Sequence, residues 1–454
     1  MKSKKLLFIT VVLIFAATAV LTGCGQDNGD SQAQNNQTQQ QDATTPADTQ
    51  DPVTGGEDVT ISFWGGWTGP DVAIMQELVD MFMADNPNIT IDFETEQWTP
   101  LFTRFLAESA VGNAPHIFAM RPMDAGQFIY LGLMDMNFAE TIGINSANYS
   151  TSVWESTMFE GNQYAIPLDQ HMHAVFYNRS MLDAAGITAP PVTGPEFIEA
   201  ARLMTLDGSG RNATENDFDP TDIVQFGLNF PMNHHVGFQM SALISQQGGT
   251  PFTADMTEVP FDTQQAINAL TFIQDLVLTY RVVPIGDASA VDTFVAENVA
   301  MFIDGPWQMA TLAGTDLDWG TTPYPVVFGH QSAWGNSHIF TFPVSNASPA
   351  QQEAMRVFIT WMSENSGGWA HAGHIPANIV GSEYAATLFG RGAFIDSMEN
   401  MYILPASPRS AELFGSSAIS PFPLAAQSLL LDGEDPAVVV ENLRNEMNSI
   451  LAMP

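Results

Sequence analysis

The spacing of apolar residues in the first folded segment predicts strands that alternate with helices. Val59–Trp64 alternates between apolar and polar side chains, and the segment after Pro70 keeps its apolar side chains on one helical face. Ile89–Glu94 and His116–Met120 predict two further strands, with a helix between them that starts at Thr99 as its cap. This order predicts a parallel sheet that helices cover on both faces.

Gly161–Asp169 interrupts this alternation with a strand that contains a proline. Because proline cannot donate to a sheet, such a strand lies at an edge or crosses between domains, and we expect the chain to leave the first domain here. Apolar periodicity predicts the elements that follow. They are a strand at Ala174–Tyr177 and helices from Ser180, at Thr193–Met204, Val236–Ser245, Thr263–Leu278, Asp287–Glu297, Pro349–Ser363 and Asp435–Leu451.

The segment from Asn298 to Trp307 combines a short buried strand with a sharp turn. Val299–Ile303 is apolar throughout, and Asp304-Gly305-Pro306 ends it. The turn places Trp307 at the carboxyl edge of a sheet, where open α/β sheets bind ligands. Its indole would offer a flat face to a C–H-rich ring such as a sugar, although an indole that caps the core is the alternative.

Residues 1–57 precede the folded sequence. A lysine-rich start and the apolar segment Leu6–Val20 predict a signal peptide that is too short to span a membrane comfortably. The Leu-Thr-Gly-Cys sequence that ends at Cys24 resembles the lipobox of bacterial lipoproteins, so 1–24 is the predicted signal peptide and Cys24 the lipid attachment site. Residues 25–57 are polar and predict a disordered tether that reaches about 30 Å.

Charge separates this chain from most soluble proteins. It has 454 residues, enough for two domains, with 50 acidic and 13 basic residues and a net charge of -37. All lysines lie in the leader. An acidic, lysine-free surface repels nucleic acid and anionic lipid, and it fits a halophilic or alkaliphilic setting. Cys24 is the single cysteine, which excludes an internal disulfide.

Several short motifs follow the tether in a fixed order. They are Ile61–Trp67, Gly112–Pro115, Tyr164–Asp169, Phe176–Leu182, Ala185–Ile187 with Pro190 and Pro191, Glu297–Trp307 and His374–Ala377. In this order they resemble the extracellular solute-binding proteins of the sugar-binding ABC transporter family, which includes maltose-binding protein. The resemblance runs from about Ile61 to the C-terminus. One departure is His116, where the family usually has an acid at a structural position.

The resemblance implies an α/β fold with two lobes, each a mainly parallel sheet flanked by helices, and a ligand cleft between them. It implies crossings near Pro167, Gly335 and Pro376 and closure by hinge bending. We expect a first lobe of 58–166 plus 338–376 and a second lobe of 167–337 plus 377–454. The implied function is that of a monomeric, membrane-anchored lipoprotein at the outer face of the cell membrane. It would capture a sugar or oligosaccharide and deliver it to the ABC transporter permease subunits, without a cofactor, enzymatic activity or nucleic acid.

The same resemblance implies which residues contact the ligand. The candidates are Trp67, Thr68, Asp124, Asp169, His171, Trp307 and Trp334, with a weaker case for Gln97 and Trp98. Aromatic faces and planar polar groups are what sugar hydroxyls and C–H surfaces require. Packing is the alternative for the tryptophans, and a solvated hinge is the alternative for Asp169 and His171.

Other chemistry has weaker support in the sequence. We expect no metal site: His171 and His173 lie on one side of a strand, and His371 and His374 form a similar pair, but no cysteine is available to complete either set. The acidic loop 207–222 lacks the spacing of an EF-hand, so we expect a solvated loop rather than a calcium site. A surface-anchored glycoside hydrolase would need two carboxylates about 5–9.5 Å apart, and 50 acids leave that alternative open. A third alternative function is that of a receptor for a cation such as a polyamine, which the acidic composition could suggest.

Overall fold

The structure is a computed structural model that describes residues 57–453, apart from 254–255, 262, 287–288 and 416–418. The predicted signal peptide, Cys24 and nearly all of the tether lie outside the described residues. Within the described residues, no helix combines the length and the apolar character that a membrane crossing requires.

The first lobe is a five-stranded sheet with the strand order β2-β1-β3-β14-β6. β1 runs parallel to β2 and β3, whereas β14 runs antiparallel to both β3 and β6. Its elements are β1 (Val59–Gly65), α1 (Asp71–Asp85), β2 (Ile89–Thr95), α2 (Trp98–Ala110), β3 (Ile117–Met120), α3 (Pro122–Tyr130), α4 (Phe138–Thr141), η1 (Ser146–Asn148), α5 (Thr151–Glu155), β4 (Met158–Phe159), β5 (Asn162–Gln163), β6 (Ala165–Pro167), β14 (Ile339–Thr341), α12 (Pro349–Glu364) and η4 (Ser366–Ala372).

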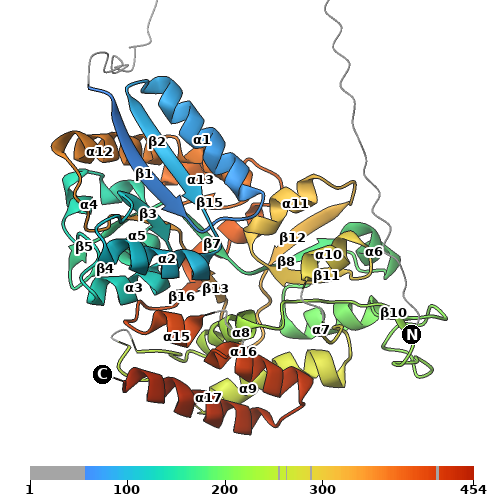
Figure 1. Cartoon of the computed structure of the whole chain (residues 1–454). Helices are drawn as coiled ribbons and strands as arrows, with labels where there is room; N and C mark the ends of the chain where they lie inside the picture. The colour runs from blue at the N-terminus through green and yellow to red at the C-terminus, as the bar shows by residue number, and fades with distance from the viewer. Residues whose placement is uncertain (1–56, 254–255, 262, 287–288, 416–418, 454) are drawn as a thin grey trace, which may run out of the picture. The chain divides into compact units, whose positions relative to one another are not determined.

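Segments from far along the chain complete this lobe. In Figure 1 the late helix α12, in orange, lies beside the blue strand β1, and buried residues of both belong to one hydrophobic cluster. The strand with Pro167 lies at the sheet edge, as predicted, because the missing N–H of proline costs no ladder bond there. His116 bonds Ser62 across the sheet, with its Nδ1 2.8 Å from the Ser62 Oγ, which fits a structural role.

A small sheet holds the crossing strands. Its order is β15-β7-β13-β16. The strands are β7 (Asp169–Met172), β13 (Ala333–Asn336), β15 (Ile375–Pro376) and β16 (Met401–Ile403). β7, β13 and β15 lie at or next to the three expected crossings, so this sheet is the hinge region between the lobes.

The second lobe has its own hydrophobic core around a three-stranded sheet, β11-β8-β12. Its elements are β8 (Ala174–Asn178), α6 (Arg179–Ala184), α7 (Gly194–Leu203), β9 (Leu206–Asp207), β10 (Ile223–Gln225), α8 (His234–Gln246), α9 (Thr263–Gln274), η2 (Asp275–Thr279), α10 (Ala290–Val295), β11 (Met301–Asp304), η3 (Pro306–Gln308), α11 (Met309–Ala313), β12 (Trp319–Pro323), α14 (Gly392–Ile395), η5 (Met398–Asn400), α15 (Ser410–Phe414), α16 (Pro421–Ala426), η6 (Gln427–Leu431) and α17 (Pro436–Leu451). The helix α13 (Ile379–Ala385) falls in the range expected for the second lobe but packs mainly on η4 of the first lobe and on β15.

One detail of the expected fold was wrong. β8 pairs antiparallel with both β11 and β12, so this sheet is not mainly parallel. The physical reason is the direction of entry: β8 carries the chain away from the crossing strand β7, whereas β12 brings it back toward β13. Parallel pairing occurs at isolated bridges beside the sheet, such as the bridge between Phe226 and Val299.

Helix ends show where local signals were sufficient. The helix predicted at Thr193–Met204 is α7, and Thr193 caps it in a capping box with Glu196. By contrast, α2 begins at Trp98 with Gln97 as its cap, and the predicted cap Thr99 lies inside the first turn. The Trp98 ring packs on Trp67 and His338, and such tertiary contacts are absent from the local sequence.

Candidate functional site

A cavity of about 610 Å³ lies between the two lobes and the crossing strands. The first lobe contributes Trp67, Thr68, Asp71, Gln97, Trp98 and Arg121. The crossing region contributes His171, Trp334, His338 and His374. The second lobe contributes His234, His235, Phe238, Trp307, Gln308 and Thr311. Segments from both lobes therefore form one cleft.

The structure brings five of the seven expected ligand residues to this cleft. They are Trp67, Thr68, His171, Trp307 and Trp334. Asp124 does not line it, because its carboxylate forms a pair of hydrogen bonds with Arg121, at 2.6 and 3.1 Å, and Arg121 faces the cavity instead. Asp169 is fully buried beneath the lining histidines.

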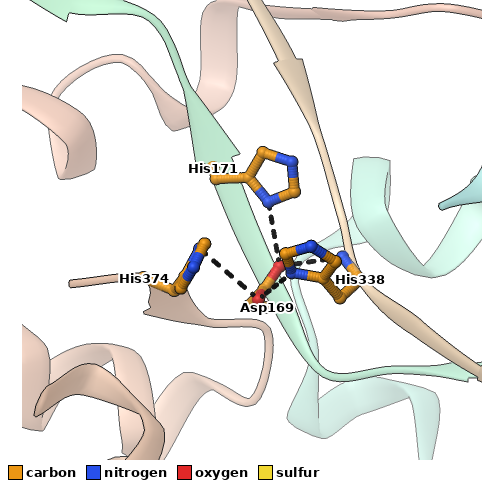
Figure 2. A group of neighbouring side chains, drawn as sticks. All are labelled: Asp169, His171, His338 and His374. Carbon is orange, nitrogen blue, oxygen red and sulfur yellow. Dashed lines mark hydrogen bonds and ion pairs between the residues drawn. The ribbon is translucent and has the colours of Figure 1, made fainter. Parts of the chain in front are cut away.

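Asp169 is the centre of the cleft floor. Its Oδ1 accepts hydrogen bonds from the backbone N–H of His338 and from the Nδ1 of His171, at 2.8 and 3.1 Å. Its Oδ2 accepts from the Nδ1 of His338 and from the indole N–H of Trp369, both at 2.7 Å. Figure 2 shows three imidazoles gathered around this one carboxylate. A buried charge with this many donors is well satisfied.

Burial and neighbouring charges set the ionisation of the floor. Burial alone would raise the pKa of Asp169, but the charges of His338 and His374 and the hydrogen bonds of His171 and His338 hold it well below its ordinary value. Burial lowers the pKa of His171 to about 3 despite its bond to Asp169. Around neutral pH the floor therefore holds an ionised Asp169 beside a neutral His171.

The second-lobe wall adds more neutral imidazoles. Burial lowers the pKa of His173 and His234 well below the ordinary value, and burial together with the Arg121 charge lowers that of His235 to about 4. The Nε2 of His173 lies 3.0 Å from the Nδ1 of His235. Neutral imidazoles can both donate and accept hydrogen bonds, which suits polar, uncharged ligands.

Aromatic rings form the walls, and they differ in how much surface they leave free. Trp334 is 2% exposed and stacks on Phe238, with ring centroids 4.3 Å apart and planes within 2°. Trp67 is also 2% exposed, packed among Phe63, Trp98 and Trp369. Trp98 and Trp307 are only half-buried, so part of each indole remains open to the cleft, although Trp98 also stacks on His338.

Trp307 lies where the strand-and-turn pattern predicted it, at the end of β11. Its ring folds back over Gly305, where any Cβ would collide with the indole. The turn itself packs on the third crossing: Gly373 has φ +106°, and a Cβ there would collide with the carbonyl oxygen of Pro306. The cleft wall and the segment that leads into His374 are therefore in direct contact.

Sequence reasoning missed much of the cleft, above all its histidines. His338 and His374 each lie next to a crossing strand, and His234 and His235 open α8 after the cap Asn233. The crossings themselves were visible as prolines and glycines in the motifs. His338 and His374 each lie within three residues of one of these expected crossings, and that was the one signal that could have marked them as candidate cleft residues.

Two lobes, the strands that cross between them and a cavity between the lobes form the architecture of a solute-binding protein. The model of the bacterial extracellular solute-binding protein family matches residues 77–378. The chain belongs to this family, whose members are binding proteins rather than enzymes.

Comparisons with individual proteins agree with the family. The chain is 23% identical over 320 residues to an uncharacterised lipoprotein of Streptomyces antibioticus, covering 65% of each chain, and 22% identical over 151 residues to a Brucella abortus binding protein, covering 33% of this chain and 36% of that one. It thus spans less than two thirds of these curated relatives.

Solved structures show the same fold. An ABC substrate-binding protein of Listeria monocytogenes in complex with cycloalternan has a TM-score of 0.73 at 18% identity, with 87% of this chain and 99% of that chain covered. A maltose/maltodextrin-binding domain of Bdellovibrio bacteriovorus bound to maltotriose has a TM-score of 0.71 at 20% identity, with 86% and 99% covered. The expected two-lobed fold is confirmed.

Proposed function

We propose that the chain is the substrate-binding component of an ABC importer that captures a neutral sugar or oligosaccharide in the cleft and delivers it to a membrane permease. The observation that carries this proposal is the pair of half-buried indoles on opposite walls, Trp98 on the first lobe and Trp307 on the second. Each offers a π-face to the C–H surface of a sugar ring. Of the expected ligand residues, we retain Trp67, Thr68, His171, Trp307 and Trp334 as direct contacts.

The charge of the cleft favours a neutral ligand over the two alternatives. Among the lining residues in the described part of the chain, Asp71 is the only carboxylate and Arg121 is the only arginine, with no lysine beside it. A polyamine site would need several carboxylates, and a glycoside hydrolase would need two of them across the scissile bond. The solved relatives named above carry neutral saccharides, cycloalternan and maltotriose.

Calorimetric titration with a panel of neutral mono- and oligosaccharides tests this function. We expect one class of saccharide to bind at one site per chain and to raise the melting temperature, since a ligand at 100 times its Kd adds about 2.7 kcal/mol. No new reducing ends should form during prolonged incubation. Binding of spermine with no response to any saccharide would contradict the proposal, as would release of reducing ends.

We also propose that Cys24 carries lipid and holds the monomer at the outer face of the cell membrane. The leader and its Leu-Thr-Gly-Cys sequence support this, as does the Streptomyces relative described as a lipoprotein. Cys24→Ser should move the protein from the membrane fraction to the medium. A variant that stays membrane-bound would contradict the anchor.

The acidic surface supports a halophilic or alkaliphilic setting for the exported protein. At a net charge of -37, side chains repel one another at low ionic strength, and salt screens that repulsion over about 10 Å at 0.1 M. The melting temperature should therefore rise with NaCl. A flat or falling curve would contradict this setting.

A further inference from the structure

The cleft floor places four potential metal ligands together. Asp169, His171, His338 and His374 each offer one ligand atom, and these atoms all lie within 4.8 Å of one another. All four residues are buried. The histidine ring centroids lie 4.7, 5.1 and 5.5 Å apart, so the three imidazoles surround one carboxylate, as Figure 2 shows.

The separations fit a single tetrahedral ion. From the Asp169 oxygens, the Nδ1 atoms of His338, His171 and His374 lie at 2.7, 3.1 and 3.6 Å. Around a metal with bonds of 2.0–2.1 Å, neighbouring tetrahedral ligands lie about 3.3 Å apart. A bound ion would replace the Nδ1 hydrogen bonds of His171 and His338 to Asp169, with the ring protons of both histidines moved to Nε2. The rings would then shift to bring the four ligand atoms, which lie within 4.8 Å of one another, to bonding distance.

His374 gives an independent reason to place a ligand here. It is 1% exposed, and neither ring nitrogen has a hydrogen-bond partner among the described residues. A buried polar nitrogen without a partner costs about 1–3 kcal/mol. Its Nδ1 faces Asp169 at 3.6 Å and its Nε2 faces the Asp71 Oδ2 at 4.0 Å. With the proton on Nε2, the lone pair of Nδ1 points at the centre of the group.

We propose that Asp169, His171, His338 and His374 form a binding site for a divalent first-row transition metal ion of the Zn²⁺ class. Three imidazoles and one carboxylate are the donor set that such ions prefer. Trp369 donates its indole N–H to the Asp169 Oδ2 at 2.7 Å, and Asp71 lies beside the far nitrogen of His374. Such outer partners orient metal ligands.

The three histidines of the proposed site come from the three different crossings between the lobes. His171 lies on β7, His338 lies between β13 and β14, and His374 directly precedes β15. Each crossing thus contributes one histidine, so a bound ion would cross-link the hinge. All three histidines also line the cleft, which is the entry path for the ion. The site does not depend on which solute the cleft walls bind.

Titration with Zn²⁺ alone tests the proposal. The protein is the mature chain without a histidine tag, freed of metal by a chelator. We expect one equivalent to bind by calorimetry, to raise the melting temperature, and to be replaced by Co²⁺ with the visible absorption of tetrahedral coordination. His374→Gln and His338→Gln should weaken Zn²⁺ binding by more than about 100-fold, because loss of even an outer partner of a ligand costs 10–100-fold.

His371→Gln is the matched control. His371 lies three residues before His374 but is exposed, and it should leave Zn²⁺ binding unchanged. Failure of the parent to bind Zn²⁺, or equal binding by the parent and His374→Gln, would overturn the proposal. Loss of binding in His173→Gln with none in His374→Gln would do so too, because it would move the ion to the group of His173, His235 and Asp304. Saccharide titration of the same proteins keeps this result separate from the proposed transport function.

Discussion

The floor and the walls of the cleft are built from different kinds of interaction. The floor centres on one ionised carboxylate, Asp169, which accepts hydrogen bonds from His171 and His338 at two of the crossings and from Trp369. The walls consist mainly of aromatic rings, each carried by one lobe, such as Trp98 and Trp307. The floor therefore joins the crossing strands to one another, whereas each wall ring belongs to a single lobe.

This difference predicts how each region responds to mutation. Removing one member of a buried polar network leaves its partners unpaired, so damage to the floor should appear as lost stability. A half-buried wall ring contacts water in the unliganded protein, so its loss should appear as lost affinity. Stability and affinity measured on the same variants separate the two regions.

Asp169→Ala should have the largest effect. It leaves the backbone N–H of His338 and the indole N–H of Trp369 without acceptors in a fully buried space. Removing one partner of a buried charged network costs about 3–5 kcal/mol. Denaturant unfolding in the presence of a chelator measures this loss without any contribution from metal.

Asp318→Ala is the control, because Asp318 forms an exposed ion pair with Arg179 at 3.3 Å. Exposed pairs contribute little to stability. If Asp169→Ala unfolds at the same denaturant concentration as Asp318→Ala, the floor does not hold the hinge together.

Local sequence signals predicted the elements but only part of the floor. β1, β2 and the capped helix α7 follow from periodicity and cap residues that lie within a few positions of each other. The floor instead joins Asp169 to His338 and His374, each of which lies more than 160 residues further along the chain. Only the fold brings them together, which explains why Asp169 and His171 were expected as ligand contacts while no cluster of histidines was predicted.

The walls show the same limit in another form. Trp307 could be placed because a strand and a Gly-Pro turn precede it directly, and it lies where expected. Trp67 and Trp334 were expected as contacts, and both line the cleft, but packing leaves each only 2% exposed. The exposed area of an indole depends on rings such as Phe238 that come from distant segments.

Asp304→Asn tests the junction between the floor and the walls of the cleft, since Asp304 is the last residue of β11 and lies three residues before Trp307. Burial raises the pKa of Asp304 to about 6, against the hydrogen bonds from Gly305 and Gln308 that lower it. A raised pKa in the folded state means that the contribution of Asp304 to stability is present below about pH 4 and is lost as pH rises through about 6. The asparagine variant lacks this loss.

Unfolding of both proteins between pH 4 and pH 8 measures the effect. As pH rises, the free energy of unfolding of the variant should increase relative to that of the parent by up to about 3 kcal/mol, since a shift of one pKa unit corresponds to 1.36 kcal/mol. Because both proteins share every other titrating group, only the difference between their curves is used. Parallel curves would mean that Asp304 stays ionised at no cost, which its burial argues against.

Trp307→Ala should have the smallest effect on stability and a clear effect on binding. The Trp307 ring is half-buried and reaches into the cleft above Gly305, so most of its loss should be felt by a bound sugar. We expect affinity to fall by about 1–3 kcal/mol, as for other stacking aromatics.

Trp334→Ala completes the comparison within the walls. Trp334 is 2% exposed and stacks on Phe238, so its removal opens a cavity and should cost about 3–5 kcal/mol of stability. Thermal melts and calorimetric titrations of the two variants should therefore diverge: Trp307→Ala folds as the parent but binds weakly, and Trp334→Ala melts early. If Trp307→Ala melts as early as Trp334→Ala yet binds its sugar as tightly as the parent while folded, Trp307 caps the core instead. The second lobe would then offer no half-buried indole for stacking on the sugar, and Trp98 on the first lobe would be left in that role.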